Sequence, residues 1–225
     1  MLSIGQSIDT TQNAVSGFER IFELLETEPD IKDTKDAIKP QSIVSSIELK
    51  DVYFEYEQDV PVLRDINLKI EPGRTVALVG PSGAGKTTLT NLIPRFYDPV
   101  RGSVAVGGYD IRKLKLECLR EQISIVLQDV FLFSGSIRDN ITLGNKTITE
   151  EAIVHAARLV GADTFIERMP GGLDYNVMER GATLSVGQRQ LISFIRAMVY
   201  DPRIIVLDEA TSSVDSETEE LIQNA

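Results

Sequence analysis

Hydrophobic residues recur at helical spacing at the start of the chain and in its second half, with an alternating stretch between. At the start, the apolar positions recur every three or four residues, which predicts a helix over residues 1 to about 28. These positions are Val15, Phe18, Ile21, Phe22 and Leu25. Residues 30–46 are polar with little periodicity and are typical of a linker. Residues 47–56 and 63–70 alternate between apolar and polar, which predicts two strands.

Three short apolar runs predict strands of another kind. They cover residues 75–79, 123–127 and 204–207. Their lack of alternation is typical of parallel strands that are covered on both faces. We therefore expect a parallel sheet in addition to the two alternating strands.

The remaining segments predict a hairpin and a mainly helical region. Residues 102–111 carry Gly107-Gly108 at the expected hairpin turn, and residues 114–122 have a helical pattern. Residues 135–200 are helical in pattern with little strand signal, and Ser136 and Thr149 are placed to cap two of the helices. The chain is thus predicted to be a mixed α/β protein with a helical insertion.

The run that ends at Val79 is followed by nine residues that match the G-x-x-x-x-G-K-[ST] phosphate loop. They are Gly80, Pro81, Ser82, Gly83, Ala84, Gly85, Lys86, Thr87 and Thr88. Glycine reaches backbone angles closed to other residues, so the N–H groups of the loop can turn toward one anion at a helix N-terminus. Lys86 is expected to reach the β- and γ-phosphates and Thr87 to ligate Mg²⁺. The flanking strand and helix favour this interpretation over a plain glycine-rich turn.

Polar residues also stand at the carboxyl ends of the other two apolar runs. Gln128 follows one run, and Asp208 and Glu209 follow the other. The carboxyl ends of parallel strands face the ligand crevice of an open α/β sheet. Asp208 is expected to hold Mg²⁺ through water, and Glu209 to orient and deprotonate the attacking water. Gln128 either touches Mg²⁺ or the water, or is an ordinary surface glutamine.

Three further features have a structural explanation beside a functional one. Tyr56 ends the first alternating strand, and its position alone favours a ring packed on a sheet face over one that stacks on a base. His155, the single histidine, lies within a helical pattern and is interpreted as structural. Leu184–Gln190 reads LSVGQRQ, and serine and glycine before a helix form a second anion-binding N-terminus.

Four motifs together, in their order and spacing, resemble the ATPase domain of an ABC transporter. They are GPSGAGKT, then Gln128, then LSVGQRQ and finally IIVLDEATSSVD. The resemblance covers residues 45–225, and residues 1–44 are similar to the end of a membrane-domain helix and its linker. It implies a P-loop NTPase of the α/β class, with a central, mostly parallel sheet, an N-terminal antiparallel β subdomain and a helical subdomain at about 133–200. It also implies ATP and Mg²⁺ as cofactors, and ATP hydrolysis that powers export across a membrane.

The resemblance also implies roles for single residues. In this family two ATPase domains pack head to tail, and the LSVGQ segment of one closes over the nucleotide of the other, which makes Ser185, Gly187 and Gln188 contacts to the partner's phosphate. It assigns Tyr56 to stacking on adenine, which reverses the preference stated above, and Gln128 to linking Mg²⁺ with the helical subdomain. Asp208 would bind Mg²⁺, Glu209 would be the catalytic base, and residues 213–215 would contact the partner's site.

Two stretches resemble exporters in particular. Residues 177–181 are similar to the exporter segment that contacts the coupling helices of the membrane domain, and Thr10–Glu28 to the cytoplasmic end of an exporter's last membrane helix. The implied partners are a second ATPase domain, in a homo- or heterodimer, and the transmembrane domain of an exporter. The implied location is the cytoplasmic face of the cell membrane.

The composition of the chain limits which classes of molecule it is expected to bind. The net charge of −11 argues against nucleic acid, because phosphate backbones require basic patches. Cys118 is the only cysteine and cannot form an internal disulfide, and no apolar run reaches the ~18–20 residues that span a bilayer. Two alternatives stand beside the exporter motor: a nucleotide-binding remnant without turnover, and a soluble ABC ATPase that acts on DNA or in translation.

The chain departs from the family at two places. Val186 stands where the family usually has glycine, and a β-branched residue there would be strained if its φ were positive. The chain also stops at Ala225, before the family's next strand and its switch histidine, and that strand would lie between the runs 75–79 and 204–207. We expect residues 1–225 alone to be unstable and nearly inactive, because unpaired N–H and C=O groups would line the gap.

Overall fold

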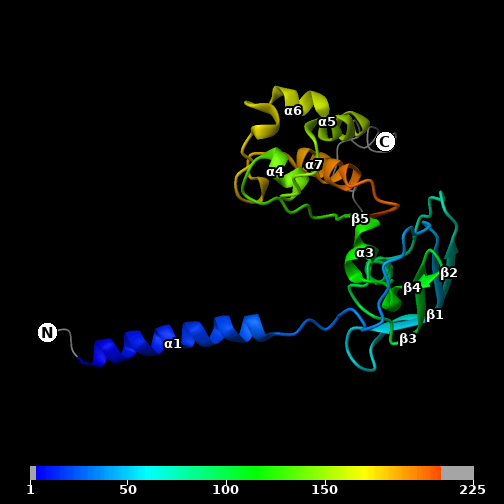
Figure 1. The fold of residues 1–225 in the computed structure, drawn as a ribbon, viewed down its shortest axis with the longest axis horizontal. Coiled ribbons are helices and arrows are strands. Elements are labelled where there is room, and N and C mark those ends of the chain that lie inside the picture. Colours follow the sequence, from blue (N-terminus) through cyan, green and yellow to red (C-terminus); the bar gives the residue numbers. More distant parts are fainter. Residues whose placement is uncertain (1–3, 209–225) are drawn as a thin grey trace. The chain divides into compact units, whose positions relative to one another are not determined.

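The chain divides into two units after Lys32. The computed structural model describes the backbone of residues 4–208 and the side chains of residues 11–208. In the first unit, α1 spans Ile4–Glu26 and confirms the predicted helix (Figure 1). Its described apolar side chains, Val15, Phe18, Ile21, Phe22, Leu24 and Leu25, are all exposed. Among the described residues, no helix has both the length and the apolar character needed to cross a membrane.

The second half of the expected linker belongs to the larger unit. The Ile38 N–H donates to the Lys113 carbonyl (2.9 Å), and the Lys115 N–H donates to the Ile38 carbonyl (3.0 Å). The Asp33 carboxylate accepts from the Leu116 N–H at 2.8 Å, and Ile43 is buried. Hydrogen bonds and one apolar anchor therefore hold residues 33–43 against the body of the larger unit, although they lack regular structure.

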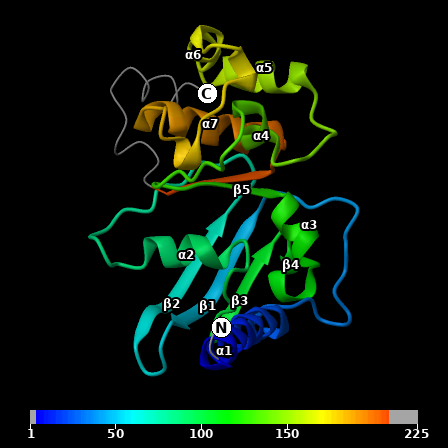
Figure 2. The same ribbon diagram turned by 90° about the vertical axis from the view of Figure 1, so that its left-hand side faces the viewer.

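Four antiparallel strands form the first sheet of the larger unit, in the order β2-β1-β3-β4 (Figure 2). They are β1 (Ile47–Glu55), β2 (Pro61–Ile70), β3 (Arg101–Val106) and β4 (Tyr109–Asp110). Gly107 (φ 60°) and Gly108 (φ 82°) form the turn between β3 and β4, where a two-residue hairpin needs two positive φ angles. The predicted alternating strands and the hairpin are confirmed.

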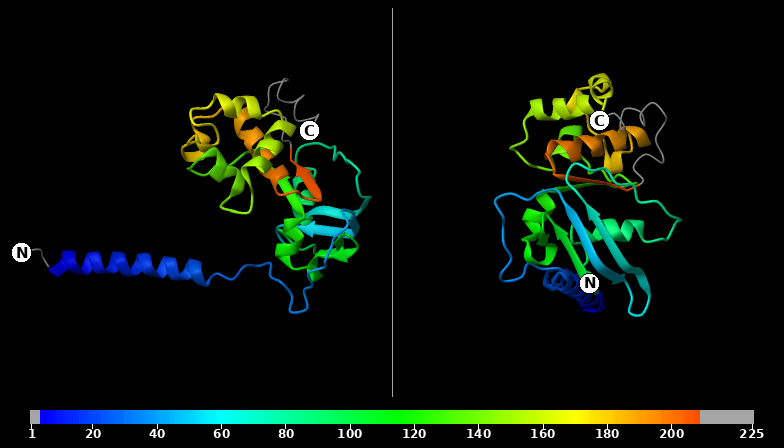
Figure 3. Two further views of the ribbon diagram at one scale, coloured as in Figure 1. Left: turned by 45° about the horizontal axis from the view of Figure 1, so that its top comes forward. Right: turned by 90° about the vertical axis from the view of Figure 1, so that its right-hand side faces the viewer.

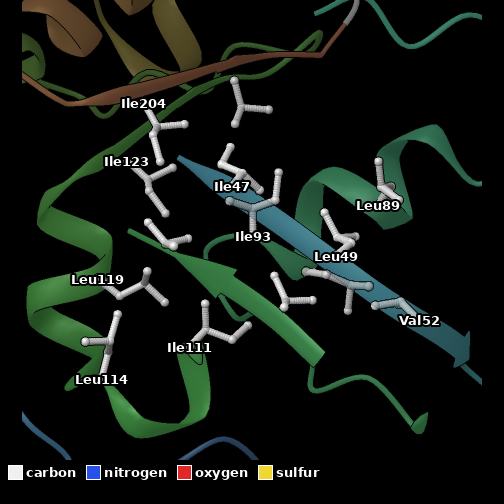
Figure 4. Close-up of a cluster of buried hydrophobic side chains, with 14 of the residues drawn as sticks. Ile47, Leu49, Val52, Leu89, Ile93, Ile111, Leu114, Leu119, Ile123 and Ile204 are labelled. Carbon is white, nitrogen blue, oxygen red and sulfur yellow. The ribbon is translucent and has the colours of Figure 1, made fainter. Parts of the chain in front are cut away.

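A hydrophobic core lies between this sheet and two short helices. These are α2 (Lys86–Leu92) and α3 (Leu116–Glu121), and a 3₁₀ turn, η1 (Ile111–Lys113), precedes α3. Figure 4 shows the inward side chains, which include Leu49 from β1, Leu89 from α2 and Leu119 from α3. Inward residues of β1 alternate with outward ones because successive side chains of a strand point to opposite faces.

The parallel part of the described structure consists of two strands, β5 (Ile123–Val126) and β6 (Ile204–Leu207). They pair in register from Ile123 with Ile204 to Val126 with Leu207. The expectation that residues 204–207 are covered on both faces is wrong for the described structure. Ile204 and Val206 are buried, but Ile205 and Leu207 are 43% and 51% exposed.

The prediction of a strand at residues 75–79 is also wrong for the described structure. This segment has no regular secondary structure, and Val76 and Val79 are 44% and 94% exposed. An apolar run becomes a strand only when a neighbouring backbone pairs with its N–H and C=O groups. None of the described strands pairs with this segment.

Helices form a second lobe with its own core around α7 (Figure 3). They are α4 (Ile137–Thr142), α5 (Glu150–Leu159), α6 (Asp163–Arg168) and α7 (Val186–Val199), with 3₁₀ turns η2 (Gly172–Asp174) and η3 (Glu179–Gly181). Ser136 caps α4 and Thr149 caps α5, as predicted. The helical insertion over 135–200 is confirmed.

Candidate functional site

The expected phosphate loop ends on a helix whose start is shaped by glycine. Gly85 is the N-cap of α2 with φ 87° and ψ 14°, and no side chain caps the helix. Gly83, two residues earlier, has φ 78°. These left-handed angles favour glycine, and a Cβ on Gly85 would also lie 2.8 Å from Leu63 Cδ2. Without a side-chain cap, the first N–H groups of α2 remain available to an anion.

Lys86 is the first residue of α2, and its side chain folds over the loop. Its Nζ donates to the carbonyl oxygens of Gly80 (2.9 Å) and Pro81 (3.1 Å). These bonds keep a positive charge above the exposed loop residues 80–84. The carbonyls are neutral acceptors, so a phosphate oxygen, as a charged acceptor, would compete well for the ammonium.

Thr87 and Asp208 meet although they lie far apart in the sequence. The Thr87 hydroxyl donates to the Asp208 carboxylate, with 3.3 Å between Oγ1 and Oδ1. Asp208 directly follows β6, and its N–H donates to the Val126 carbonyl of β5 at 3.0 Å. A hydroxyl and a carboxylate oxygen are hard ligands that suit Mg²⁺, which usually keeps several waters and takes few protein ligands. In the described part of the chain no group of three or more His, Cys, Asp or Glu side chains could hold a metal.

Tyr56 lies close to the same helix, in an aromatic group. Its hydroxyl donates to Thr88 Oγ1 at 3.1 Å, and the residue is 51% exposed. Phe54 and Tyr97 pack edge-to-face against this ring, with centroids 4.9 and 5.2 Å away. These two neighbours fix the orientation of the Tyr56 ring and leave part of its surface exposed. The contacts therefore agree with a packing role, and the exposed surface agrees with stacking on a base.

The sequence did not single out Tyr97 or Phe54 as neighbours of Tyr56. Phe54 and Tyr56 stand two residues apart on β1 and just beyond it, and that spacing places side chains on one face of a strand. This signal could have found Phe54. Tyr97 follows α2, and no local pattern brings it to β1.

Gln128 follows β5 at the same sheet edge as Asp208. It is exposed, and its side chain makes no hydrogen bond among the described residues. The structure therefore brings the chain at Gln128 to the edge that carries Asp208 without directing its side chain to a partner. Glu209 and residues 213–215 lie outside the described residues.

Ser185, Gly187 and Gln188 stand at the start of α7 in the helical lobe. The Ser185 hydroxyl accepts from the Gln188 N–H (3.2 Å), and the Gln188 side chain accepts from the Ser185 N–H (2.9 Å). This capping box satisfies two N–H groups of the helix start. No hydrogen bond or ion pair joins these three residues to the phosphate loop within residues 11–208.

Two other sequence expectations concern residues near α7. Val186 has helical geometry and is not among the positive-φ residues, so the anticipated strain does not arise. In residues 177–181, by contrast, Met178 (φ 58°) and Arg180 (φ 54°) both have positive φ angles, and only Arg180 is left-handed helical. His155 is exposed on α5.

Comparisons with known proteins agree with this geometry. A family model described as ABC transporter matches residues 63–212. The chain is 46% identical over 222 residues to the uncharacterized ABC transporter ATP-binding protein YknV of Bacillus subtilis. This match covers 99% of the present chain and 37% of YknV. The chain is also 45% identical over 217 residues to an ATP-dependent lipid A-core flippase of Syntrophus aciditrophicus. That match covers 96% of the present chain and 36% of the flippase.

A solved structure, described as a bacterial Atm1-family ABC exporter with ATP bound, superposes with a TM-score of 0.87. Its sequence is 34% identical, and the match covers 98% of this chain and 38% of that chain. The chain thus spans less than two fifths of the length of each of these relatives.

Proposed function

Because this chain belongs to the ABC transporter family and has its α/β P-loop NTPase fold, we propose that it hydrolyses Mg²⁺-bound ATP to power export across a membrane. The observation that carries the proposal is the contact between Thr87 and Asp208. Two motifs that the sequence places at opposite ends of the domain supply a hydroxyl and a carboxylate to one point beside the phosphate loop. A glycine turn with no bound ligand would not require that convergence.

The residues present fit both ATP and Mg²⁺. The N–H groups at the start of α2 and the Lys86 ammonium would hold the phosphates, and Thr87 and Asp208 would hold the metal. Bound Mg²⁺ would supply positive charge that offsets the charge of the phosphates. Tyr56 presents a half-exposed ring to a base, and stacking of this kind contributes ~1–3 kcal/mol per base.

The proton of the attacking water needs an acceptor. We assign this role to Glu209, which follows Asp208 in the sequence, and the role of orienting the water to Gln128. A carboxylate at this position accepts the proton, and a neutral amide of the same shape does not. The assignment rests on the order of the residues after β6 and on the family.

The relatives suggest the proposed partners. The relatives are a lipid A-core flippase and an ABC exporter, both much longer than this chain. We propose that the chain works with a transmembrane domain at the cytoplasmic face of the membrane and with a second ATPase domain, head to tail. In that pair Ser185, Gly187 and Gln188 would contact the nucleotide of the partner subunit.

ATP turnover tests this proposal. In a polypeptide of the relatives' length, Glu209→Gln should still bind ATP but lose hydrolysis by ~10²–10⁴-fold, the usual contribution of a general base. It should also trap a dimer that contains two ATP molecules. If Glu209→Gln turns over ATP within about twofold of the parent, Glu209 is not the base. If the parent binds ATP without hydrolysing it, the chain is a nucleotide-binding remnant.

A further inference from the structure

Helix α7 carries a buried side chain that the proposed function does not use. Gln190 is fully buried, and neither atom of its amide, Nε2 or Oε1, has a hydrogen-bond partner among the described residues. Buried amides almost always have partners, because an unsatisfied donor or acceptor keeps the full cost of leaving water. Within the described part of the chain, both polar atoms of this amide are therefore available to a partner in a second arrangement of the protein.

The chain that follows β5 runs along α7. Near the carboxyl end of the helix, the Ser124 hydroxyl of β5 donates to the Ala197 carbonyl at 3.1 Å. Nearer the start of the helix, Leu132 and Arg189 meet at Gly181, where an added Cβ would lie 2.9 Å from a carbon of each side chain. Figures 1 and 2 show this stretch passing beside α7 toward α4.

Gln190 lies between these two contacts. It follows Arg189, and it shares a helix face with Phe194 and Ala197, since residues three and four positions apart lie on one side of a helix. All three are buried. Phe194 and Ala197 belong to the same buried cluster as Val126 and Leu132, the residues on either side of the stretch that follows β5.

Residues 127–130 have backbone N–H and C=O groups without hydrogen bonds among the described residues, although hydrogen bonds hold the chain on either side of them. Val126 before them pairs in β5. After them, Phe133 exchanges hydrogen bonds with Asn140 through its N–H (2.8 Å) and its carbonyl (2.9 Å). Within the described residues, 127–130 make no hydrogen bond through their own N–H or C=O groups. Among the described residues, the Gln190 amide and the backbone of residues 127–130 thus both lack partners, and each offers the donor and the acceptor that the other needs.

We propose that Gln190 is a positioning residue whose side-chain amide hydrogen-bonds the backbone of residues 127–130 and so directs Gln128 to the nucleotide. The segment then has two arrangements, the described one and one held by Gln190. Mg²⁺-ATP favours the second arrangement, because only there does Gln128 gain a contact with the bound nucleotide. The inference rests on the proposed function, since it explains how that site acquires Gln128.

Hydrogen exchange, read by mass spectrometry on a peptide that contains residues 127–130, tests the proposal. In the parent, a polypeptide of the relatives' length, Mg²⁺-ATP should slow exchange of these amides. In Gln190→Met, which keeps the length of the side chain and removes its polar atoms, nucleotide should still bind but the added protection should be lost. The dissociation constant for Mg²⁺-ATP should rise by roughly two- to tenfold, as expected for one hydrogen bond.

Leu191→Met is the matched control. Leu191 is the next residue on α7 and is also buried, but it has no polar atom to lose. This variant should keep the nucleotide-dependent protection of residues 127–130. Equal protection in Gln190→Met and in the parent overturns the proposal, and so does equal loss in both variants.

Thermal melting without nucleotide separates a positioning role from a purely structural one. Gln190→Met should melt at or above the temperature of the parent, because it removes an amide that has no partner among the described residues. A lower melting temperature, or a failure to fold, means that Gln190 already has a partner and overturns the proposal. A parent that shows no calorimetric heat with Mg²⁺-ATP contradicts the proposed function itself, whereas a parent that binds it without protecting residues 127–130 contradicts this inference alone.

Discussion

The two helices that begin at the expected phosphate contacts, α2 and α7, start in opposite ways. At α2 the N-cap is Gly85 in a left-handed conformation with no side-chain cap, whereas at α7 Ser185 and Gln188 form a complete capping box. The first arrangement leaves N–H groups free for a ligand, and the second satisfies them from within the chain. This difference favours the start of α2 as the primary anion site of the proposed function.

The start of α7 can still contribute through the Ser185 hydroxyl. Its oxygen accepts from the Gln188 N–H, and its own O–H remains able to donate. An anion from a partner subunit could accept this hydrogen bond without opening the cap. The difference predicts that substitutions at α2 change nucleotide binding most, and that substitutions at α7 first change stability.

Removing the charge at the start of α2 should have the largest effect. Lys86→Ala loses its charge-assisted hydrogen bonding to phosphate. One such bond contributes ~1.5–3 kcal/mol, so its loss should lower ATP affinity by roughly 10- to 150-fold. Isothermal titration calorimetry measures this loss. Lys146→Ala, in the helical lobe and outside the site, is the control and should bind ATP like the parent. Unchanged affinity in Lys86→Ala would remove the phosphate-loop assignment.

The glycine start of α2 should tolerate no side chain. Gly85→Ala forces a left-handed angle on alanine and brings its Cβ against Leu63, so we expect a loss of ~1–3 kcal/mol in the free energy of unfolding. Gly80→Ala is the control, because its φ is not positive and its Cβ would have only an ordinary contact, 3.4 Å from Ala84 Cβ. Urea denaturation compares the two, and an equal effect would show that the left-handed angle at Gly85 carries no special cost.

The capped start of α7 should behave like any other capping box. Ser185→Ala should cost ~1 kcal/mol of stability. Ser136→Ala, which removes the same motif from α4, should cost about the same. Urea denaturation tests both, and a Ser185→Ala chain as stable as the parent would mean that this hydroxyl does not cap α7.

We expect the smallest change in stability at Asp139, the acid of the α4 capping box, and we expect this change to depend on pH. The Ser136 N–H, and then the Ser136 hydroxyl, hold the pKa of Asp139 below its ordinary value of 3.8. A lowered pKa stabilises the folded state above the ordinary value, and this contribution is lost as pH falls through the folded value. Asp139→Asn should therefore lose less than ~0.5 kcal/mol at pH 7, because the pair is exposed and screened, and less still near pH 3. A difference between parent and variant that grows on acidification would contradict this account.

Local signals in the sequence predicted most of the elements. The spacing of Val15 to Leu25 predicted α1, the pair Gly107-Gly108 predicted the β3–β4 turn, and Ser136 and Thr149 predicted two caps. Each of these depends on residues within one or two turns of the chain, and the sequence contains that information directly.

The features that the sequence missed depend on distant partners. Residues 75–79 have the composition of a strand, but a strand also needs a neighbouring backbone, and none pairs with them in the described structure. The same holds for the contact of Tyr97 with Tyr56 and for the burial of Gln190, whose amide has no partner in the described part of the chain. In the candidate site, the phosphate loop and Asp208 were predicted from motifs, whereas the contact between Thr87 and Asp208 required the fold.

The Mg²⁺ dependence of ATP binding tests the central claim, that Thr87 and Asp208 together complete a site at the start of α2. ATP affinity is measured by calorimetry with Mg²⁺ and with EDTA, in the parent and in Asp208→Asn, which keeps the shape of the side chain and removes its charge. Mg²⁺ should strengthen ATP binding by the parent, and Asp208→Asn should lose most of that gain while its EDTA value stays close to the parent's. An equal gain from Mg²⁺ in both chains would contradict the account.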